Sequence, residues 1–524
     1  MALDENIYEL RREKIKKIEA LGQPAYRTKY EYSHSIEQIL ADYSPKTGEE
    51  LEQSPVNVRV AGRIMAIRLM GKAGFAHIQQ GGKKLQIYVK KDAVGDQGFE
   101  LYKLLDLGDH IGVSGYLFRT RTGELSVHVE ELAFLSKDLL PLPEKWHGLT
   151  DVELRYRQRY VDLFMNPEVR EVFLKRTKMI QSFRHTFDMH DFVEVETPMM
   201  QPIAGGAVAR PFVTHHNTLD MDLYLRIAPE LYLKRLVVGG LDRVYEINRN
   251  FRNEGLGWRW NPEFTMLEAY QAYTNYQGIM DLTQESITEA GKAVNGSPKS
   301  KWTRTVDGKE VVEELDWSNW QRFTMREAII KFWPDKAGAK PEMGDFGSAE
   351  GVRMLVDRFN AGHSHMPYDA NAPTGKTIAA LFEACAEEHL MQPTLIYEFP
   401  TAISPLSKQK ADEPDWTERF EIFAGQMEIA NGFSELNDPV DQRERFEGQL
   451  KERERGDDEA HQMDEDYIRA LSYGMPPAGG VGIGMDRVCM LLTDQHTIRD
   501  VILFPLLRPE KTAAEAAEEP EEKK

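Results

Sequence analysis

Two neighbouring segments of the chain combine an arginine, several carboxylates and aromatic rings. Residues 251–255 read FRNEG, and residues 261–268 read NPEFTMLE. A guanidinium grips a phosphate with a planar fork, a carboxylate can hold Mg²⁺ or an amine, and a ring can stack on a base. These side chains suit a site that binds a nucleotide and stabilises the charge that develops in a reaction at its phosphate. A charged hairpin on the protein surface is the alternative interpretation.

Two later segments, residues 420–438 and 482–487, carry residues suited to the same site. Glu421 and Glu428 offer carboxylate oxygens, which can complete a Mg²⁺ shell together with phosphate oxygens. Their separation is odd, so on one regular strand they would lie on opposite faces, and we expect a bend or bulge that brings them together. Arg487 follows a glycine-rich run at a predicted helix start, where it can meet a phosphate or stack on a base.

Two other runs resemble nucleotide-binding loops, and we reject both. Residues 370–377 (ANAPTGKT) lack the first glycine of a phosphate loop and contain Pro373, which removes an amide donor. We expect instead the N-terminus of a helix over Ile378–His389. Residues 480–484 (GVGIG) lack the third glycine of a dinucleotide fingerprint. The pair His215-His216 is interpreted as the polar end of a strand rather than a metal site.

Composition indicates an ordinary globular protein with more than one domain. The chain has 524 residues, of which 41% are hydrophobic and 29% charged. No apolar run approaches a membrane span, and the first residues are acidic where a signal peptide would be basic, which predicts a cytoplasmic protein without a membrane partner. Cys385 and Cys489 lie far apart in apolar stretches, so we expect buried thiols rather than a disulfide or a zinc site.

The net charge of −20 argues against a nucleic-acid partner but does not exclude one, because binding depends on local patches. Much of the acidity lies in residues 511–524, which we expect to be a disordered tail. Residues 10–18 are basic and helical in pattern. They form either an arm that binds a nucleic-acid backbone or a solvated helix face.

The elements that must position these residues begin with a β-rich module at residues 56–137. Its order of strand, strand, strand, helix, strand and strand is that of an OB-fold barrel, whose face binds oligonucleotides. A plain β-domain without a ligand is the alternative. We expect strands at 56–60, 63–67, 75–79, 85–89, 110–118 and 124–129, and a helix at 99–107.

Longer helices and strands follow from residue 151. Glu168–Met189 carries apolar residues at helical spacing and leads into an extended run at 192–195 that Pro198 stops. Residues 291–350 are polar and irregular, so we expect an insertion there. The predicted organisation is a helical extension at 1–55, the barrel at 56–137, a linker at 138–150, a catalytic domain at 151–510 and the tail at 511–524.

With these motifs in order, the chain resembles the bacterial class II lysyl-tRNA synthetases from the barrel through Pro509. The three class II motifs match the helix and strand that end at Pro198, the run 251–255 with its loop, and the run 482–487. The resemblance implies an α+β fold. An N-terminal OB-fold β-barrel would precede a class II synthetase catalytic domain, whose antiparallel sheet is flanked by helices.

A further run, residues 431–438 (NGFSELND), resembles the lysyl enzymes in particular. The related aspartyl and asparaginyl enzymes present an arginine to the substrate side chain where this chain has Glu435. An acid at that position suits an ammonium substrate. The resemblance therefore implies L-lysine as the amino acid.

The resemblance also implies roles at the nucleotide. Arg252 would grip the α-phosphate of ATP, and Glu254 would read the adenine. Phe264 would stack on the adenine, with Arg487 on its other face. The family usually has a histidine directly before Asn261-Pro262, whereas this chain has Trp258-Arg259-Trp260. An indole cannot give the γ-phosphate the same donor, so we expect Arg259 to make this contact.

Further ligands follow from the same resemblance. Glu421 and Glu428 would hold one or two of about three Mg²⁺ ions per active site. The lysine pocket would be lined by Gly206, Glu230, Glu268, Tyr270, Asn431, Phe433 and Glu435. The anticodon would be read in the barrel by Arg68, Phe75, Gln86 and Glu131. A ring for stacking and an amide for hydrogen bonds suit an unstacked pyrimidine.

The implied reaction has two steps. The lysine carboxylate attacks the α-phosphorus of ATP and gives lysyl-adenylate and pyrophosphate, and the 3′ hydroxyl at the end of tRNA(Lys) then takes the lysyl group. The carboxylate is already a nucleophile, so catalysis falls to Arg252, Arg487 and Mg²⁺ through positioning and charge neutralisation. The resemblance also implies a homodimer formed through the first motif.

Two rival functions remain open from the sequence. A synthetase paralogue that modifies a protein lacks the barrel, as that group is known, whereas this chain has it. A nucleic-acid-binding protein with an inactive synthetase domain would not need the complete set Arg252, Glu421, Glu428 and Arg487. Pyrophosphate exchange separates an inactive domain from the two enzymes, which differ in their acceptor.

Overall fold

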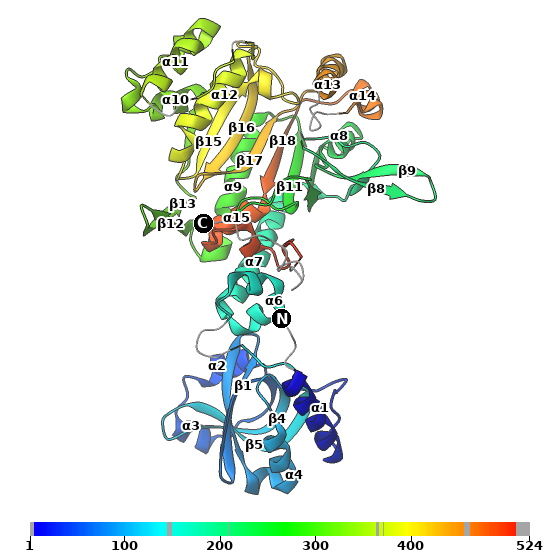
Figure 1. The fold of residues 1–524 in the computed structure, drawn as a ribbon, viewed down its shortest axis with the longest axis vertical. Coiled ribbons are helices and arrows are strands. Elements are labelled where there is room, and N and C mark those ends of the chain that lie inside the picture. The colour runs from blue at the N-terminus through cyan, green and yellow to red at the C-terminus, as the bar shows by residue number, and fades with distance from the viewer. Residues whose placement is uncertain are drawn as a thin grey trace, which may run out of the picture. The chain divides into compact units, whose positions relative to one another are not determined.

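A computed structural model describes most of the chain, namely residues 5–143, 149–207, 209–362, 366–369, 371–454 and 462–509. The chain forms two compact units, Met1–Arg170 and Glu171–Lys524 (Figure 1). The first unit therefore extends past the predicted start of the catalytic domain at residue 151. The predicted tail at 511–524 and residues 144–148 of the predicted linker lie outside the described residues.

The first unit contains a closed barrel with the strand order β1-β2-β3-β5-β4. Its elements are β1 (Asn57–Met70), β2 (Ala73–Gln80), β3 (Lys83–Lys90), α4 (Lys91–Leu104), β4 (His110–Arg119) and β5 (Leu125–Ser136). Alternate side chains point inward, and Val58, Val60 and Ile64 of β1 are exposed by 3% or less. The predicted order of strands and helix is confirmed.

One detail of the barrel prediction is wrong. The strands expected at 56–60 and 63–67 are a single strand, β1, whose pairing with β2 is irregular between Ile64 and Ala66. Gly62 in the expected gap continues the pairing instead of turning the chain, because it lies opposite Ile111 of β4. The helix α4 begins at Lys91, earlier than the expected residue 99.

Helices surround the barrel within the first unit. The predicted basic helix is α1, and two of its cations bind the unit itself: Lys14 Nζ lies 2.6 Å from Asp106 Oδ1, and Arg11 Nη1 donates to the Leu140 carbonyl. The helices of this unit before and after the barrel are α1 (Glu5–Ala20), α2 (Ile36–Tyr43), α3 (Gly48–Gln53), α5 (Val152–Arg157) and α6 (Arg159–Met165).

The second unit is built on a sheet with the order β14-β15-β16-β17-β18-β11-β10-β6. Its strands are β6 (Val193–Glu194), β10 (Arg243–Phe251), β11 (Glu263–Ala272), β14 (Gln321–Thr324), β15 (Thr394–Pro400), β16 (Trp416–Ala424), β17 (Met427–Ser434) and β18 (Ala478–Gly484). The inner strands pair antiparallel as expected, whereas the edge pairs β6–β10 and β14–β15 are parallel. The sheet is therefore mixed.

Helices cover both faces of this sheet and leave a gap on one of them. One face packs on α7 (Pro167–Met189), α9 (Tyr276–Asn295) and α15 (Met485–Thr493). On the other face, α10 (Met325–Phe332), α11 (Ala349–Gly362) and α12 (Thr374–Cys385) pack near β15 and β16. Next to β11, the same face packs on α8 (Glu230–Val238) and α14 (Glu465–Ser472). The space between these two helical covers is where a site can open.

Residues 291–350 are regular, so the expectation of an irregular segment is wrong. They contain the hairpin of β12 (Lys299–Val306) and β13 (Lys309–Asp316), the edge strand β14 and the helix α10. The dipeptide Asp307-Gly308 has positive φ at both positions, as a two-residue hairpin turn requires. This Asp-Gly signal was present in the sequence and was missed because charged side chains hid the alternation. Its status as an insertion remains a prediction.

The remaining elements complete the second unit. The rejected phosphate loop leads into α12, which begins at Thr374 rather than at Ile378. His215 and His216 end β8, and the described residues hold no cluster of three or more metal-binding side chains. Both cysteines are buried. The other elements are β7 (Met200–Gln201), β8 (Phe212–His216), β9 (Met221–Leu225), α13 (Pro439–Glu454), α16 (Ile498–Val501) and the short 3-10 turns Asp335–Ala337, Met343–Gly347, Glu387–His389 and Thr401–Ile403.

No helix within the described ranges is long and apolar enough to cross a membrane.

Candidate active site

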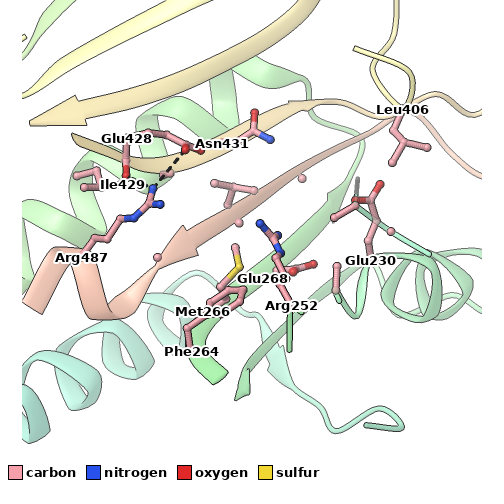
Figure 2. Close-up of a pocket in the computed structure, with 18 of the residues that line it drawn as sticks. Glu230, Arg252, Phe264, Met266, Glu268, Leu406, Glu428, Ile429, Asn431 and Arg487 are labelled. Carbon is pink, nitrogen blue, oxygen red and sulfur yellow. Dashed lines mark hydrogen bonds and ion pairs between the residues drawn. The ribbon is translucent and has the colours of Figure 1, made fainter. Parts of the chain in front are cut away.

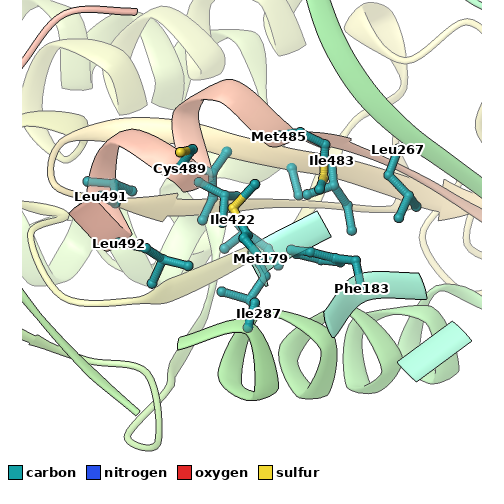
Figure 3. Close-up of a cluster of buried hydrophobic side chains, with 14 of the residues drawn as sticks. Met179, Phe183, Leu267, Ile287, Ile422, Ile483, Met485, Cys489, Leu491 and Leu492 are labelled. Atoms are coloured by element: carbon teal, nitrogen blue, oxygen red, sulfur yellow. The ribbon is translucent and has the colours of Figure 1, made fainter. Parts of the chain in front are cut away.

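A cavity of about 440 Å³ opens on the sheet between the two helical covers (Figure 2). Strand periodicity decides which residues reach it. On β11, Met266 and Glu268 line the cavity, whereas Leu267 belongs to the core beneath (Figure 3). On β18, Gly482 lines the cavity, whereas Ile483 belongs to that core. The alternation therefore brings Glu268 and Gly482 to the cavity and leaves Leu267 and Ile483 in the core.

The glycines of β18 make room for the cavity. A Cβ on Gly480 would collide with the carboxylate of Glu435 and the ring of Tyr270, and a Cβ on Gly482 would lie 2.7 Å from Met266 Cε. The run rejected as a dinucleotide fingerprint is therefore a strand that leaves space beside it. Gly206, also predicted at the site, has a φ of +89°, a conformation that favours glycine.

The predicted phosphate-binding arginines both reach the cavity. Arg252 follows β10, and its guanidinium lies 5.1 Å from the centroid of the Phe264 ring. No described residue accepts a hydrogen bond from the buried Arg252 Nε. Arg487, in the first turn of α15, donates to the backbone carbonyl of Glu428 at 2.6 Å. A guanidinium that borders the cavity and has a buried nitrogen without a partner can donate to a bound anion.

Arg259 lines the same cavity, packed against the two tryptophans that flank it. Its guanidinium lies 4.5 Å from the Trp258 ring and 5.6 Å from the Trp260 ring. Nη1 donates to the carbonyl of Gln426 in the β16–β17 turn, and Nε has no partner among the described residues. Burial lowers the pKa of this guanidinium. These contacts hold Arg259 at the wall of the cavity, and its role at a phosphate stays a prediction.

The predicted metal carboxylates lie on two strands of a hairpin, not on one strand. Gly425 and Gln426 form its turn, both with positive φ. Glu428 lies opposite Phe423, and the register shifts next to this pair, so that Asn431 lies opposite Glu421. Because opposite residues share a face, a turn and a bulge together place both carboxylates on one side of the sheet. The expected bend or bulge is confirmed.

The two carboxylates differ in their surroundings. Glu428 lines the cavity, and its Oε2 lies 3.3 Å from Arg487 Nη1. Glu421 is not among the described residues that line it, and its Oε1 lies 2.6 Å from Arg419 Nη2. Burial raises the pKa of Glu421 to about 8, against the effect of Arg419 and with that of Glu428. Glu387 also adds to the rise. Neighbouring carboxylates of this kind suit Mg²⁺, which keeps waters and binds substrate phosphates.

The predicted lysine-binding acids surround a buried lysine of the chain itself. Lys234 is fully buried, and its Nζ lies 2.6 Å from Glu230 Oε1 and 2.5 Å from Glu435 Oε2. The rings of Tyr270 and Phe433 lie 6.0 Å and 5.4 Å from this ammonium. Sequence reasoning missed Lys234, although its spacing of four from Glu230 on a helix was a signal for an ion pair.

Glu268 lies in the same cavity beside a second group of charges. Burial raises its pKa to about 8, Glu230 and Glu246 add to that effect, and Arg252 opposes it. Asn250 Nδ2 donates to Glu268 Oε1 at 3.4 Å. The cavity is therefore lined by buried acids that are ready to bind a cationic group. Asn431, also predicted for the lysine pocket, and Glu254, predicted to read adenine, line the same cavity.

In the barrel, the structure brings together three of the four predicted anticodon residues. Arg68 lies opposite Phe75 in the β1–β2 pair, and Gln86 on β3 is two positions from the residue opposite Phe75. Their side chains therefore share the outer face. Glu131 is not part of this group, because it lies five residues further along β5 than Ser126, the residue opposite Gln86.

Three residues that sequence reasoning missed fix the amide of Gln86. Ser126 Oγ donates to Gln86 Oε1 at 2.8 Å, and Gln86 Nε2 donates to Glu124 Oε2 at 2.8 Å. The other oxygen of Glu124 lies 2.9 Å from His77 Nε2. This network sets which end of the amide is the donor. Glu124 was separated from Gln86 by a long stretch of sequence, so no local signal linked them.

Comparison with known proteins matches both units to families. Residues 151–508 match the model of class II tRNA synthetases (D, K and N), and residues 58–135 match an OB-fold nucleic acid binding domain. The chain is 52% identical to the lysine--tRNA ligase of Pelotomaculum thermopropionicum, over 97% of this chain and 96% of the relative.

Two further relatives give the same result. The lysine--tRNA ligase of Syntrophomonas wolfei is 50% identical over 97% of this chain and 99% of its own, and that of Carboxydothermus hydrogenoformans is 50% identical over 96% and 98%. The match covers the barrel, the sheet and the cavity alike. The chain therefore belongs to the class II tRNA synthetases, in the family of the bacterial lysine–tRNA ligases.

Proposed function

We propose that the protein activates L-lysine with ATP, giving lysyl-adenylate and pyrophosphate, and then transfers lysine to the 3′ end of tRNA(Lys). The observation that carries this proposal is the distribution of charge in the cavity. Glu230 lies at one end, Arg487 at the other and Arg252 between them in Figure 2. This order matches the ammonium of lysine at Glu230, the α-phosphate of ATP at Arg252, where the two substrates react, and the adenine at Arg487.

At the acidic end, Glu230 and Glu435 bind the substrate ammonium, and Tyr270 and Phe433 enclose it. Both acids are buried and share one cation, Lys234, so a substrate without the ammonium would leave one negative charge unbalanced away from water. The cost of an unpaired buried charge is several kcal/mol, which gives strong discrimination against an uncharged isostere.

In the centre, Arg252 binds the α-phosphate through the guanidinium that lacks a partner on Nε. The lysine carboxylate is the nucleophile, and pyrophosphate leaves with the electron pair of the broken P–O bond. No side-chain base is needed, so the residues act by holding the reacting atoms in line and by balancing negative charge. Arg487 and Phe264 hold the adenine between them, Glu254 reads it, and Arg259 binds the γ-phosphate.

Glu421 and Glu428 are the proposed ligands of Mg²⁺, with Glu428 facing the cavity and Glu421 behind it on the same face of the hairpin. The ion, when bound, would neutralise charge on the ATP phosphates. A total of about three ions per active site remains the expectation, because Mg²⁺ is commonly held by one or two carboxylates and by phosphates.

The barrel is the proposed reader of the anticodon. Phe75 offers a ring for stacking, Arg68 offers a cation beside it, and the fixed amide of Gln86 offers a donor and an acceptor of defined polarity. A role for Glu131, which lies on β5, stays in the proposal as a separate contact of the barrel with the anticodon. A cytoplasmic location also belongs to the proposal, because tRNA charging serves translation there.

A homodimer through the first motif is proposed on exposed apolar side chains. Met189, Val193 and Met200 are exposed by 70%, 49% and 56%, and large apolar side chains in one segment commonly mark an interface. Light scattering after size exclusion tests this point: Val193→Glu should give a monomer if the interface is here.

Lysine-dependent exchange between ATP and pyrophosphate, followed by charging of tRNA(Lys), tests the function. Exchange together with charging is the expected result. Exchange without charging would point to a protein acceptor. Absence of exchange would show that the protein does not activate lysine. Glu435→Gln serves as the matched variant, because it removes the charge at the acidic end and leaves the nucleotide end intact.

A further inference from the structure

Lys234 places an ammonium of the protein beside the carboxylates that are proposed to bind the substrate ammonium. It donates a hydrogen bond to Glu230 Oε1 and lies 2.5 Å from Glu435 Oε2. A buried ammonium is stable only when its charge is paired. Here both partners, Glu230 and Glu435, line the cavity. The same ion pairs therefore hold these side chains in place and set the net charge of the pocket.

These ion pairs engage one oxygen of each carboxylate. Among the residues that the structure describes, no hydrogen-bond partner reaches Glu435 Oε1. That oxygen borders the cavity beside Gly480, where a Cβ would collide with it. An ammonium that enters from the cavity can therefore meet Glu435 Oε1 and Glu230 Oε2 while Lys234 keeps the opposite oxygens.

Within the group of ion-paired side chains, the charges add up to a simple requirement, since the neighbouring Glu268 is opposed by Arg252 and Arg226. Glu230, Glu435 and Lys234 together carry a net charge of −1 when both acids are ionised. One substrate ammonium neutralises that charge. Without Lys234 the two neighbouring carboxylates would carry −2, and one of them would take up a proton, as coupled acids do.

We propose that Lys234 is a specificity-determining residue, an internal counter-ion that holds Glu230 and Glu435 and sets the pocket to accept a single ammonium. Lys234 acts through these two acids and is a positioning residue. The inference rests on the proposed function, because it concerns how the same pocket selects lysine.

The electrostatics of Glu435 agree with this role. Burial raises the pKa of Glu435 to about 8, Lys234 acts in the opposite direction, and Glu230 adds to the rise. The other titratable groups that face this cluster are Glu268 and Tyr270 from β11 and Tyr467 from α14. Loss of the lysine charge would therefore move the pKa of the acid pair further upward.

The test compares the pH dependence of kcat/KM for lysine, measured by pyrophosphate exchange, in the wild type and in Lys234→Met. Methionine keeps the length and removes the charge. The expected result is a rise of roughly 30-fold or more in the lysine KM, because the two acids lose their common partner. The ATP KM should change less than about threefold, and the rising limb of the profile should move up by about one pH unit.

Lys137→Met is the matched control. Lys137 is also fully buried between two carboxylates, with Nζ 2.6 Å from Asp106 Oδ2 and 2.7 Å from Asp109 Oδ2, but it lies in the barrel. Its loss should lower the Tm and leave the lysine KM and the pH profile of exchange unchanged. The control separates the loss of a buried ion pair from the loss of the pocket charge.

A second variant guards against a Lys234→Met protein that does not fold. Lys234→Arg keeps the charge, so its pH profile should stay at the wild-type position even if the larger side chain raises the lysine KM. A profile that moves in Lys234→Arg as far as in Lys234→Met would overturn the inference, and so would an unchanged lysine KM and profile in Lys234→Met. Absence of exchange in the wild type would instead reject the proposed function.

Discussion

The barrel and the cavity each bury a lysine between two carboxylates, and the two sites differ in what else the carboxylates bind. In the barrel, Asp109 accepts hydrogen bonds from the backbone amides of Asp106 and Asp138 at 2.8 and 2.9 Å, in addition to the ion pair with Lys137. In the cavity, Glu435 Oε1 has no partner among the described residues. Satisfied charges stabilise a fold, whereas a charge left open beside a cavity is kept for a ligand.

The same contrast separates Arg304 from two arginines of the cavity, all three in the second unit. Arg304 in the β12–β13 hairpin donates through Nε to Glu313 Oε1 at 2.9 Å. Arg259 and Arg252 have a buried Nε that no described residue accepts. The unsatisfied donors lie at the nucleotide side of the cavity, and the unsatisfied acceptor lies at the lysine side. Binding of both substrates would satisfy all of them.

The largest effect is expected for the open acid. Glu435→Gln should raise the lysine KM by roughly 100-fold or more, because a charge-assisted contact in a buried site is lost. The ATP KM should change less than about threefold. Steady-state exchange kinetics measure both, and equal effects on the two substrates would contradict the assignment. Asp109→Asn in the barrel is the control, and it should lower the Tm without changing the lysine KM.

The next effect concerns the space beside that acid. Gly480→Ala places a methyl group against the Glu435 carboxylate and the Tyr270 ring, both of which are buried. The lysine KM should rise by roughly 30-fold, because neither neighbour can move without a cost. Gly482→Ala should have a smaller effect, since its methyl group meets the flexible end of Met266. Exchange kinetics of the two variants measure this order. A larger rise in the lysine KM for Gly482→Ala than for Gly480→Ala would contradict it.

The sequence predicted the barrel from local patterns and the cavity acids through the family resemblance. Turn glycines and alternating strands marked the barrel, and compact motifs carried Arg252 and Arg487, whereas Glu230, Glu268 and Glu435 followed from the resemblance to the lysyl enzymes. The relation between Lys234 and Glu435 was beyond such reasoning, because 201 residues separate them and only the packing of α8 beside the end of β17 brings them together. Contacts between residues so far apart along the chain produce no periodic pattern in the sequence.

The metal carboxylates illustrate a partial success. Their odd spacing indicated a bend or bulge, and the hairpin supplies both, but the sequence did not show that Gly425 and Gln426 make the turn. Glutamine at a position with positive φ is uncommon, so turn propensity pointed elsewhere. Tertiary pairing of β16 and β17 decided the conformation.

A third prediction addresses the donor at the nucleotide side. Arg259→Ala should raise the ATP KM by roughly 10-fold and leave the lysine KM within about twofold, because a charged hydrogen bond to phosphate is lost. An unchanged ATP KM would remove Arg259 from the site. Arg304→Ala is the control with a satisfied guanidinium, and neither KM should change.

A fourth prediction uses the pKa of the open acid. Burial and Glu230 raise the pKa of Glu435, and Lys234 opposes them. A fraction of the free enzyme therefore holds a proton on Glu435 near neutral pH, and the incoming ammonium favours its release. Lysine binding should strengthen as the pH rises through this range, by at most about tenfold per pH unit, and level off once Glu435 is ionised in the free enzyme. Calorimetry in buffers of different ionisation enthalpy should detect this proton release near pH 7. Glu435→Gln should abolish this release, and an unchanged release would locate the proton elsewhere.

The smallest effect is expected in the barrel, where the side-chain amide of Gln86 already has hydrogen-bond partners within the protein. Ser126→Ala removes the hydroxyl that donates to Gln86 Oε1, while Glu124 still accepts from Nε2. The amide keeps its polarity, so the KM for tRNA(Lys) in the charging assay should rise only about threefold, the worth of one neutral hydrogen bond. Exchange without tRNA should be unchanged. Glu124→Gln should have the larger effect, because an amide in place of the carboxylate can turn its own NH₂ toward Gln86 and reverse the amide. Equal effects of the two variants would show that the amide is not held by this network when tRNA binds.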